Sequence, residues 1–155
     1  MTTGAGKPPV FPSEPFCEGF FRRIMDEVDK KLRAFQQGEL DAMVMYRDLS
    51  ERVFGEKDRD LLKSIAAQEG RHAAICRGLT CVNLDCKKGT SRAVSFLYAV
   101  LRKKATFRLL AFAEKKAGKK YEKFVEKYDI NELSTVAEDE YGHAEKLLSA
   151  AKEEG

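Results

Sequence analysis

The chain contains two histidines, and each ends a Glu-x-x-His unit that follows a Glu-x6-Tyr unit. In chain order the two copies of this pattern are Glu39/Tyr46 with Glu69/His72, and Glu114/Tyr121 with Glu140/His143. Carboxylate and imidazole groups together are ligands that iron and manganese accept in proteins. Four carboxylates carry about four negative charges, which two divalent cations would neutralise. The repeated pattern therefore predicts a two-metal site.

The spacing within each unit suits an α-helix. Steps of three and seven residues turn a helix by about 300° and about 700°, so both steps keep two side chains on one face. Glu69 could then bind one ion together with His72, while the Tyr46 phenol reaches a ligand carboxylate from behind. A Glu-rich helical protein also scatters such pairs by chance, so a merely packed or solvated set of side chains is the alternative.

Apolar residues recur at helical spacing over most of the chain, and no segment alternates in the manner of a strand. The pattern predicts four helices, over residues 16–54, 58–78, 91–128 and 130–152. Gly38 marks a candidate break in the first helix, and Asp129 with Glu132 resembles a capping box at the start of the fourth. The proposed ligands lie inside the apolar stripes, where a carboxylate needs a counter-ion. We therefore expect an all-α four-helix bundle with a di-metal site at its centre.

Length and composition fit a single domain. The 155 residues can bury a sizeable core, and the net charge of +3 with 34% charged residues argues against both a nucleic-acid binder and a membrane-surface protein. No apolar run approaches a bilayer span, and the opening residues lack the apolar core of a secretory signal, so a cytoplasmic location is expected. Residues 1–15 hold all four prolines and predict a flexible tail, which leaves 16–155 as the domain.

The ordered set of units resembles the ferritin-like di-iron carboxylate superfamily, and within it the rubrerythrin group, over about residues 18–152. The iron ligands implied by this resemblance are Glu39, Glu69, His72, Glu114, Glu140 and His143. The resemblance also implies that Glu69 and Glu140 bridge two iron ions, although manganese or a mixed pair fits the same ligand types. Tyr46 and Tyr121 would support the ligand carboxylates, and Asp139 would orient a ligand histidine from another helix.

Two departures from the rubrerythrin pattern bear on function. Ala117 stands where rubrerythrins usually have a further carboxylate, and the chain has no rubredoxin-like Cys-x-x-Cys pairs, so it is similar to the erythrin type and would need a separate electron-donor protein. The resemblance implies an oxidoreductase that reduces hydrogen peroxide or dioxygen and protects against oxidative stress. A ferroxidase or iron-storage protein, and a non-catalytic iron-binding module, are the alternatives.

The cysteines and a lysine cluster carry weaker signals. Cys76, Cys81 and Cys86 stand five residues apart, Cys17 stands alone, and the spacing matches no common zinc or iron–sulfur site. Free thiols are expected, with a Cys81–Cys86 redox pair as the alternative. The cluster of Lys115, Lys116, Lys119, Lys120 and Lys123 predicts a solvated helix face, with docking of an acidic electron carrier as the alternative.

The connection between the second and third helices is short for its task. In a ferritin-like bundle these helices run parallel, so the link must return along the bundle. With the predicted boundaries it must cover about 50 Å, whereas eleven residues reach at most about 40 Å. Either the third helix starts later than its apolar pattern indicates, or the two helix pairs belong to different chains. We therefore expect a homodimer that could be domain-swapped, so that each site would draw one helix pair from each subunit.

Overall fold

The computed structural model of the protein describes residues 15–153, with side chains from residue 22 onward. It contains α1 (Pro15–Ser50), α2 (Glu56–Thr80), α3 (Gly89–Tyr128), the short 3-10 helix η1 (Asn131–Leu133) and α4 (Ser134–Ala150). No strand occurs in this part of the chain, which confirms the all-α prediction. The tail predicted for residues 1–15 lies outside the described residues except for Pro15, which begins α1. Gly38 does not break α1, which continues through it.

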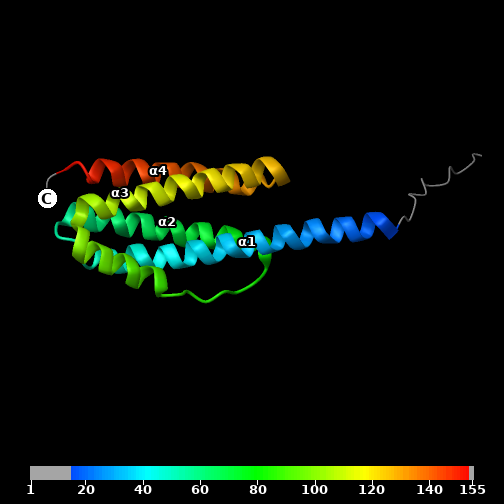
Figure 1. The fold of residues 1–155 in the computed structure, drawn as a ribbon, viewed down its shortest axis with the longest axis horizontal. Helices are drawn as coiled ribbons and strands as arrows, with labels where there is room; N and C mark the ends of the chain where they lie inside the picture. Colours follow the sequence, from blue (N-terminus) through cyan, green and yellow to red (C-terminus); the bar gives the residue numbers. More distant parts are fainter. Residues whose placement is uncertain (1–14, 154–155) are drawn as a thin grey trace, which may run out of the picture.

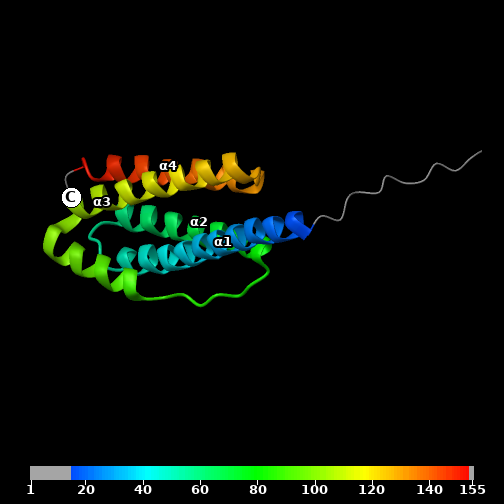
Figure 2. The ribbon, with the colours of Figure 1, turned by 45° about the vertical axis from the view of Figure 1, so that its right-hand side comes forward.

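The four helices lie side by side in two hairpins, α1 with α2 and α3 with α4 (Figure 1). The hairpins face each other, because α1 also contacts α3 and α2 also contacts α4. The N-terminal turns of α1 extend past the bundle, as the views of Figures 1 and 2 both show. No helix among the described residues combines the length and the apolar character that a bilayer span needs.

Two apolar clusters fill the bundle, one on each side of its middle. One includes the fully buried side chains of Leu49, Leu62, Ile65, Phe107 and Leu147. The other includes Leu32, Cys76, Phe124, Leu133 and Val136. Each large side chain buried in this way stabilises the fold by about 1.5–3 kcal/mol. The two clusters therefore hold the helices rigidly above and below the polar residues that lie between them.

A sharp bend in α3 solves the problem of the short connection. Arg102 has φ 62° and ψ −176°, so residues 89–101 form a separate helical segment set at an angle to the rest of α3. The rest of α3 begins about 17 Å before Glu114, not the 35 Å that a straight helix from residue 91 would need. The straight part of the third helix thus starts later than its apolar pattern indicates, and a single chain can contain both helix pairs. The geometric reason for a domain swap disappears, while the homodimer remains a prediction.

Contacts along α1 guide this crossover. Residues 81–88 run back beside α1, where Gln36 Nε2 donates to the Val82 carbonyl at 2.8 Å and the Lys87 amide donates to Asp41 at 2.7 Å. Ser91 then donates to Asp48 at 2.6 Å. The conformation of Arg102 is one that usually belongs to glycine and costs about 1–3 kcal/mol. The contact of Ser91 before the bend and the 2.8 Å ion pair of Lys103 with Asp58 after it hold the chain in this conformation.

The predicted capping box at the start of the fourth helix is wrong. Asp129 instead ends α3 in the left-handed conformation, with φ 55°, and its amide donates to the Val125 carbonyl. Aspartate tolerates this conformation better than most residues. The chain then passes through η1, and α4 begins at Ser134 with no side-chain cap. The aspartate therefore acts as a stop signal for one helix and not as a start signal for the next.

Candidate metal centre

The six predicted ligands meet in the middle of the bundle, and each helix contributes to them. Glu39 comes from α1, Glu69 and His72 from α2, Glu114 from α3, and Glu140 and His143 from α4. All six residues are buried, and none is more than 6% exposed. Their ligand atoms form two groups, within each of which the atoms lie within 4.8 Å of one another. Such a buried cluster could hold a metal ion.

Glu69 and Glu140 belong to both groups, whereas the other four residues belong to one each. Glu69 lies 3.4 Å from His72 Nδ1 and 3.0 Å from His143 Nδ1. Glu140 lies 3.2 Å from His72 Nδ1 and 4.0 Å from His143 Nδ1. Both histidines therefore turn the same ring nitrogen toward the two central carboxylates. This is the arrangement in which those carboxylates could contact two ions at once.

Several of these buried atoms lack a hydrogen-bond partner within the described structure. They are both carboxylate oxygens of Glu69, one oxygen of Glu140, Nδ1 of His72, and both ring nitrogens of His143. A buried polar atom that is left unpaired costs about 1–3 kcal/mol, and more when it is charged. All of these atoms except Nε2 of His143 point into the cluster as potential ligand atoms. The residues present therefore fit cation binding, since bound cations would satisfy the oxygens and nitrogens that the protein leaves unpaired.

The two tyrosines connect the hairpins. Tyr46 on α1 donates a hydrogen bond to Glu114 on α3, and Tyr121 on α3 donates one to Glu39 on α1. Both tyrosines are almost completely buried. Each phenol thus restrains one oxygen of a predicted ligand and leaves the other oxygen of that carboxylate free. Both tyrosines thus contact a predicted ligand carboxylate, and in each case that carboxylate belongs to the opposite hairpin.

Two further residues touch this network. Asp139 Oδ2 lies 3.0 Å from His72 Nε2, so the carboxylate fixes the ring with Nδ1 toward the cluster. The Cys76 thiol lies 3.8 Å from the Tyr121 hydroxyl. The family resemblance implied Asp139, whereas Cys76 was considered only together with the other cysteines, although it follows His72 by one helical turn. That i, i+4 spacing was the available signal.

Without a metal, the cluster holds protons. Burial lowers the pKa of His72, but the surrounding carboxylates of Glu140, Glu39 and Glu69 outweigh it and raise that pKa to about 12. The pKa of His143 rises to about 9 because Glu114 and Glu69 outweigh the same penalty. Burial raises the pKa of Glu39 to about 8 and that of Glu140 to about 10. Metal ions would therefore have to displace protons from this site.

Glu69 behaves differently from the other carboxylates. Burial raises its pKa, but the neighbouring imidazoles of His143 and His72 outweigh this effect and hold the pKa at about 2. The protons of the metal-free cluster therefore reside on the two imidazoles and on Glu39 and Glu140. Glu69 stays a carboxylate between two imidazolium rings.

A cavity of about 520 Å³ opens onto the cluster between α1 and α3. Its polar residues are Glu39, Glu69, Glu114 and Glu140 at the cluster, together with Asp41, Thr90, Lys120 and Tyr121. The rest is lined mostly by small or apolar side chains, which include Ala34, Gly38, Ala42, Ala113 and Ala117. The sequence analysis did not identify this cavity. The sequence feature that could have indicated the cavity is the recurrence of small residues every four positions. These are residues 34, 38 and 42 on α1 and residues 113 and 117 on α3.

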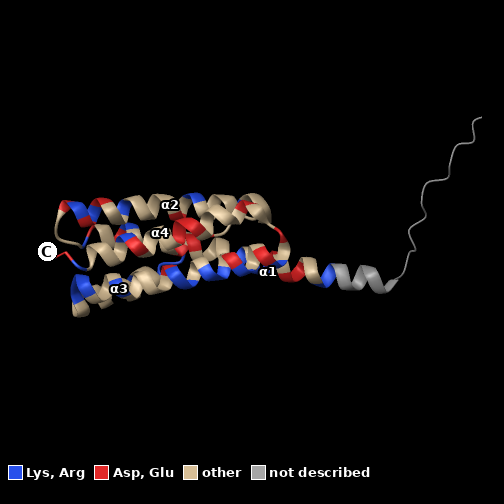
Figure 3. Cartoon of the chain, turned by 90° about the horizontal axis from the view of Figure 1, so that it is seen from above, with Lys and Arg blue, Asp and Glu red and all other residues tan. Residues whose placement is uncertain are grey.

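The weaker predictions have mixed outcomes. Cys76 is buried, Cys81 and Cys86 are exposed, and all three are free thiols, while the side chain of Cys17 lies outside the described part. The five clustered lysines are all exposed, which agrees with a solvated face, and Figure 3 shows basic residues recurring along α3. Lys120 differs from the others because it also lines the cavity.

Comparison of this chain with protein-family models, with curated proteins and with solved structures finds no match. The geometry of the site is thus the observation on which a functional conclusion has to rest.

Proposed function

We propose that the protein binds two iron ions in this cluster and reduces hydrogen peroxide or dioxygen with electrons from a separate donor protein. The observation that carries the proposal is the buried set of six carboxylate and imidazole groups. Four of them, Glu69, His72, Glu140 and His143, have atoms with no hydrogen-bond partner within the described structure. Glu39, Glu69, His72 and Glu140 would hold one ion, and Glu69, Glu114, Glu140 and His143 the other. When bound, two ferrous ions supply the two electrons that peroxide reduction requires.

The protein side chains have three tasks in this proposal. Tyr46 and Tyr121 hold the outer carboxylates in place from the opposite hairpin. Asp139 keeps His72 in the tautomer that presents Nδ1. The two apolar clusters flank the ligand residues and limit access by water. A small oxidant would therefore enter from the side of α1 and α3, where the cavity opens.

Metal content is the first test. The purified protein is loaded anaerobically with ferrous iron, desalted, and analysed for metal and protein. Two ions per chain are expected. The double variant His72→Ala/His143→Ala should bind fewer than one, whereas a variant of an exposed residue such as Lys116→Ala should still bind two. No bound metal in the unmodified protein would remove the basis of the proposal.

Peroxide turnover then separates the functional classes. The reduced, iron-loaded protein is mixed with hydrogen peroxide in the presence of an excess of chemical reductant. Many turnovers per site favour a peroxidase. One rapid oxidation followed by release or mineralisation of ferric iron favours a ferroxidase, and slow oxidation with stable binding favours a non-catalytic iron-binding module.

A further inference from the structure

The cavity beside the proposed metal centre is much larger than peroxide or dioxygen needs, and most of its lining is apolar. It occupies about 520 Å³, and most of its walls away from the glutamates consist of Phe35, Met45, Val94 and Leu110 together with the small residues named above. A small polar oxidant gains nothing from such walls. An apolar molecule gains binding free energy for each methylene group that it buries there.

The space exists because small residues of α1 and α3 face each other. A Cβ atom added at Gly38 would meet no heavy atom within 4 Å. Ala42 lies one helical turn farther along α1, while Ala113 and Ala117 line the opposite wall from α3. The segment before the Arg102 bend closes one end of the space through Thr90 and Val94. The result is a groove that runs along the two helices past Glu39 and Glu114.

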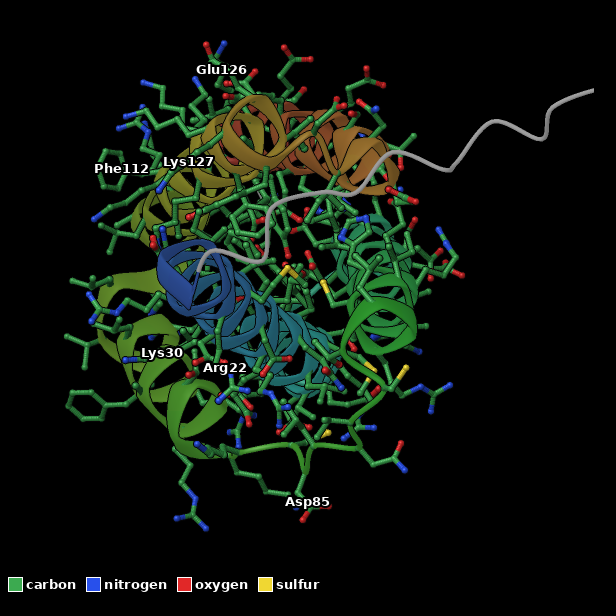
Figure 4. All side chains as sticks on the ribbon, turned by 90° about the vertical axis from the view of Figure 1, so that its right-hand side faces the viewer. Arg22, Lys30, Asp85, Phe112, Glu126 and Lys127 are labelled. Atoms are coloured by element: carbon green, nitrogen blue, oxygen red, sulfur yellow. The ribbon has the colours of Figure 1, made fainter. Side chains whose placement is uncertain are left out.

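The other end of the groove is basic. A second cavity of about 350 Å³ adjoins the first, and the two share Ala34, Phe35 and Lys120. Phe35, Phe124 and Tyr128 contribute its apolar lining, and its cationic side chains are Lys31, Lys120, Lys123 and Lys127. In Figure 4 Lys127 lies between α3 and the first turns of α1, whereas Phe112 points away from the bundle.

The four lysines are not equally engaged. Lys31 and Lys127 both pair with Glu27, at 2.8 Å and 3.4 Å. Lys120 and Lys123 form no ion pair with any described residue, and both are exposed. These two lysines could therefore receive an anionic group from a ligand without losing an existing partner. Their positions in the lining place that group at the mouth of an apolar groove.

We propose that the two cavities form one binding site for an anionic amphiphile of the fatty-acid type. Its carboxylate lies beside Lys120 and Lys123, and its unbranched hydrocarbon chain follows the groove between Gly38 and Ala117. Lys120 stands six residues after Glu114, which is about 9 Å along α3, so a chain of medium length reaches the metal centre. The assignment rests on the proposed function only in placing metal ions beside the end of that chain.

Decanoate is a suitable probe, titrated by calorimetry into the metal-free protein and into protein loaded with redox-inert zinc. We expect saturable binding to both forms. The double variant Lys120→Glu/Lys123→Glu should weaken it at least 10-fold. The matched control is Lys116→Glu/Lys119→Glu, which makes the same change of charge on the same helix at lysines outside both cavities, and it should weaken binding less than 3-fold.

A second pair of variants tests the groove itself. Gly38→Leu should fill the open space and weaken decanoate binding at least 10-fold. Gly78→Leu is its control, because Gly78 is also an exposed helical glycine with open space around it but lines neither cavity. Circular dichroism establishes that both variants are folded. If Gly38→Leu fails to fold, the lysine pairs still decide the matter.

Three results would overturn the assignment. They are absence of binding to both forms, equal weakening by the two lysine pairs, and binding to the zinc form alone that is insensitive to Lys120 and Lys123. The last result would mean that the carboxylate sits on the metal ions. If the protein binds two metal ions but no decanoate, the ligand site alone is rejected. If it binds decanoate but no metal, the proposed function alone is rejected.

Discussion

The two hairpins contribute the same ligand types at the same spacing, but they do not provide the same surroundings. His72 of the first hairpin is fixed through Nε2 by Asp139 of the second, at 3.0 Å. His143 has no partner for its Nε2 within the described residues. The residue before Glu140 is Asp139, whereas the residue before Glu69 is Gln68. The first hairpin therefore has no carboxylate at the position from which Asp139 of the second hairpin contacts His72.

The tyrosines repeat this contrast. Tyr121 lies 3.8 Å from the Cys76 thiol, which stands four residues after His72. The residue four after His143 is Leu147, so the second hairpin offers no thiol at the equivalent position. The ligand positions are thus duplicated in the two hairpins, whereas the side chains that contact the ligands and the tyrosines are not. Two ions bound here would differ in affinity and in redox behaviour, because groups that contact the ligands tune the metal.

Removal of a shared carboxylate should have the largest effect. Glu69→Ala or Glu140→Ala should abolish binding of both ions, because each residue belongs to both ligand groups. Glu39→Ala or Glu114→Ala should abolish binding of one ion, because each belongs to a single group. Metal analysis after anaerobic loading measures the difference. Equal losses from all four variants would show that the centre does not divide into shared and single ligands.

Dependence of stability on pH should be opposite in the metal-free and metal-loaded proteins. In the folded metal-free protein, the pKa values of four groups lie above their ordinary values, namely those of Glu39, Glu140, His72 and His143. Between pH 6 and pH 9 the folded state therefore holds more protons than the unfolded state. Its free energy of unfolding should fall as pH rises, by at least about 2 kcal/mol. The low pKa of Glu69 acts in the opposite direction only below about pH 4.5.

The metal-loaded protein should gain stability over the same pH range, since ions bind the deprotonated ligands. Urea unfolding followed by circular dichroism, with and without a chelator, measures both curves. Parallel curves would indicate that metal and protons do not compete for the same groups.

Asp139→Asn tests the unequal support of the two histidines. Loss of the carboxylate that orients His72 should lower metal affinity about 10- to 100-fold. Gln68→Ala should leave affinity nearly unchanged, because His143 Nε2 has no partner to lose. Competition with a chromophoric chelator gives the affinities. An equal loss in the two variants would mean that Gln68 supports His143 after all.

Two glycines extend the comparison to packing, where the effects should be smallest. A Cβ atom at Gly118 would lie 3.0 Å from the Tyr141 ring and 3.2 Å from the Ala137 carbonyl, so α3 and α4 would have to move apart. Gly118→Ala should destabilise the protein by about 1–2 kcal/mol.

At Gly70 the near atom is the Met43 sulfur, at 3.2 Å, on a flexible side chain. Gly70→Ala should leave the free energy of unfolding within about 0.5 kcal/mol of its starting value or increase it, since alanine favours the helix. Urea unfolding compares the two variants. A larger loss at Gly70 would show that α1 and α2 are the more tightly packed hairpin.

Helical periodicity and the repeated units were sufficient to predict four helices and to place all six candidate ligands on their inner faces. The reason is local: spacings of three, four and seven residues determine which side chains share a helix face, and a carboxylate within an apolar stripe has to find a partner inside the fold. The same spacing identified Tyr46 and Tyr121, whereas the role of Asp139 was implied by the family resemblance and not by periodicity.

Tertiary structure alone decided the path between the hairpins. The bend at Arg102 is held by the contacts of Ser91 with Asp48 and of Lys103 with Asp58, which join residues far apart in the chain. No local pattern announces a strained backbone whose cost is offset by such distant contacts. The role of Asp129 as the end of α3, and the groove formed where small residues of two helices face each other, were hidden for the same reason. Sequence spacing specifies the face on which a residue lies, and only packing specifies what that face meets.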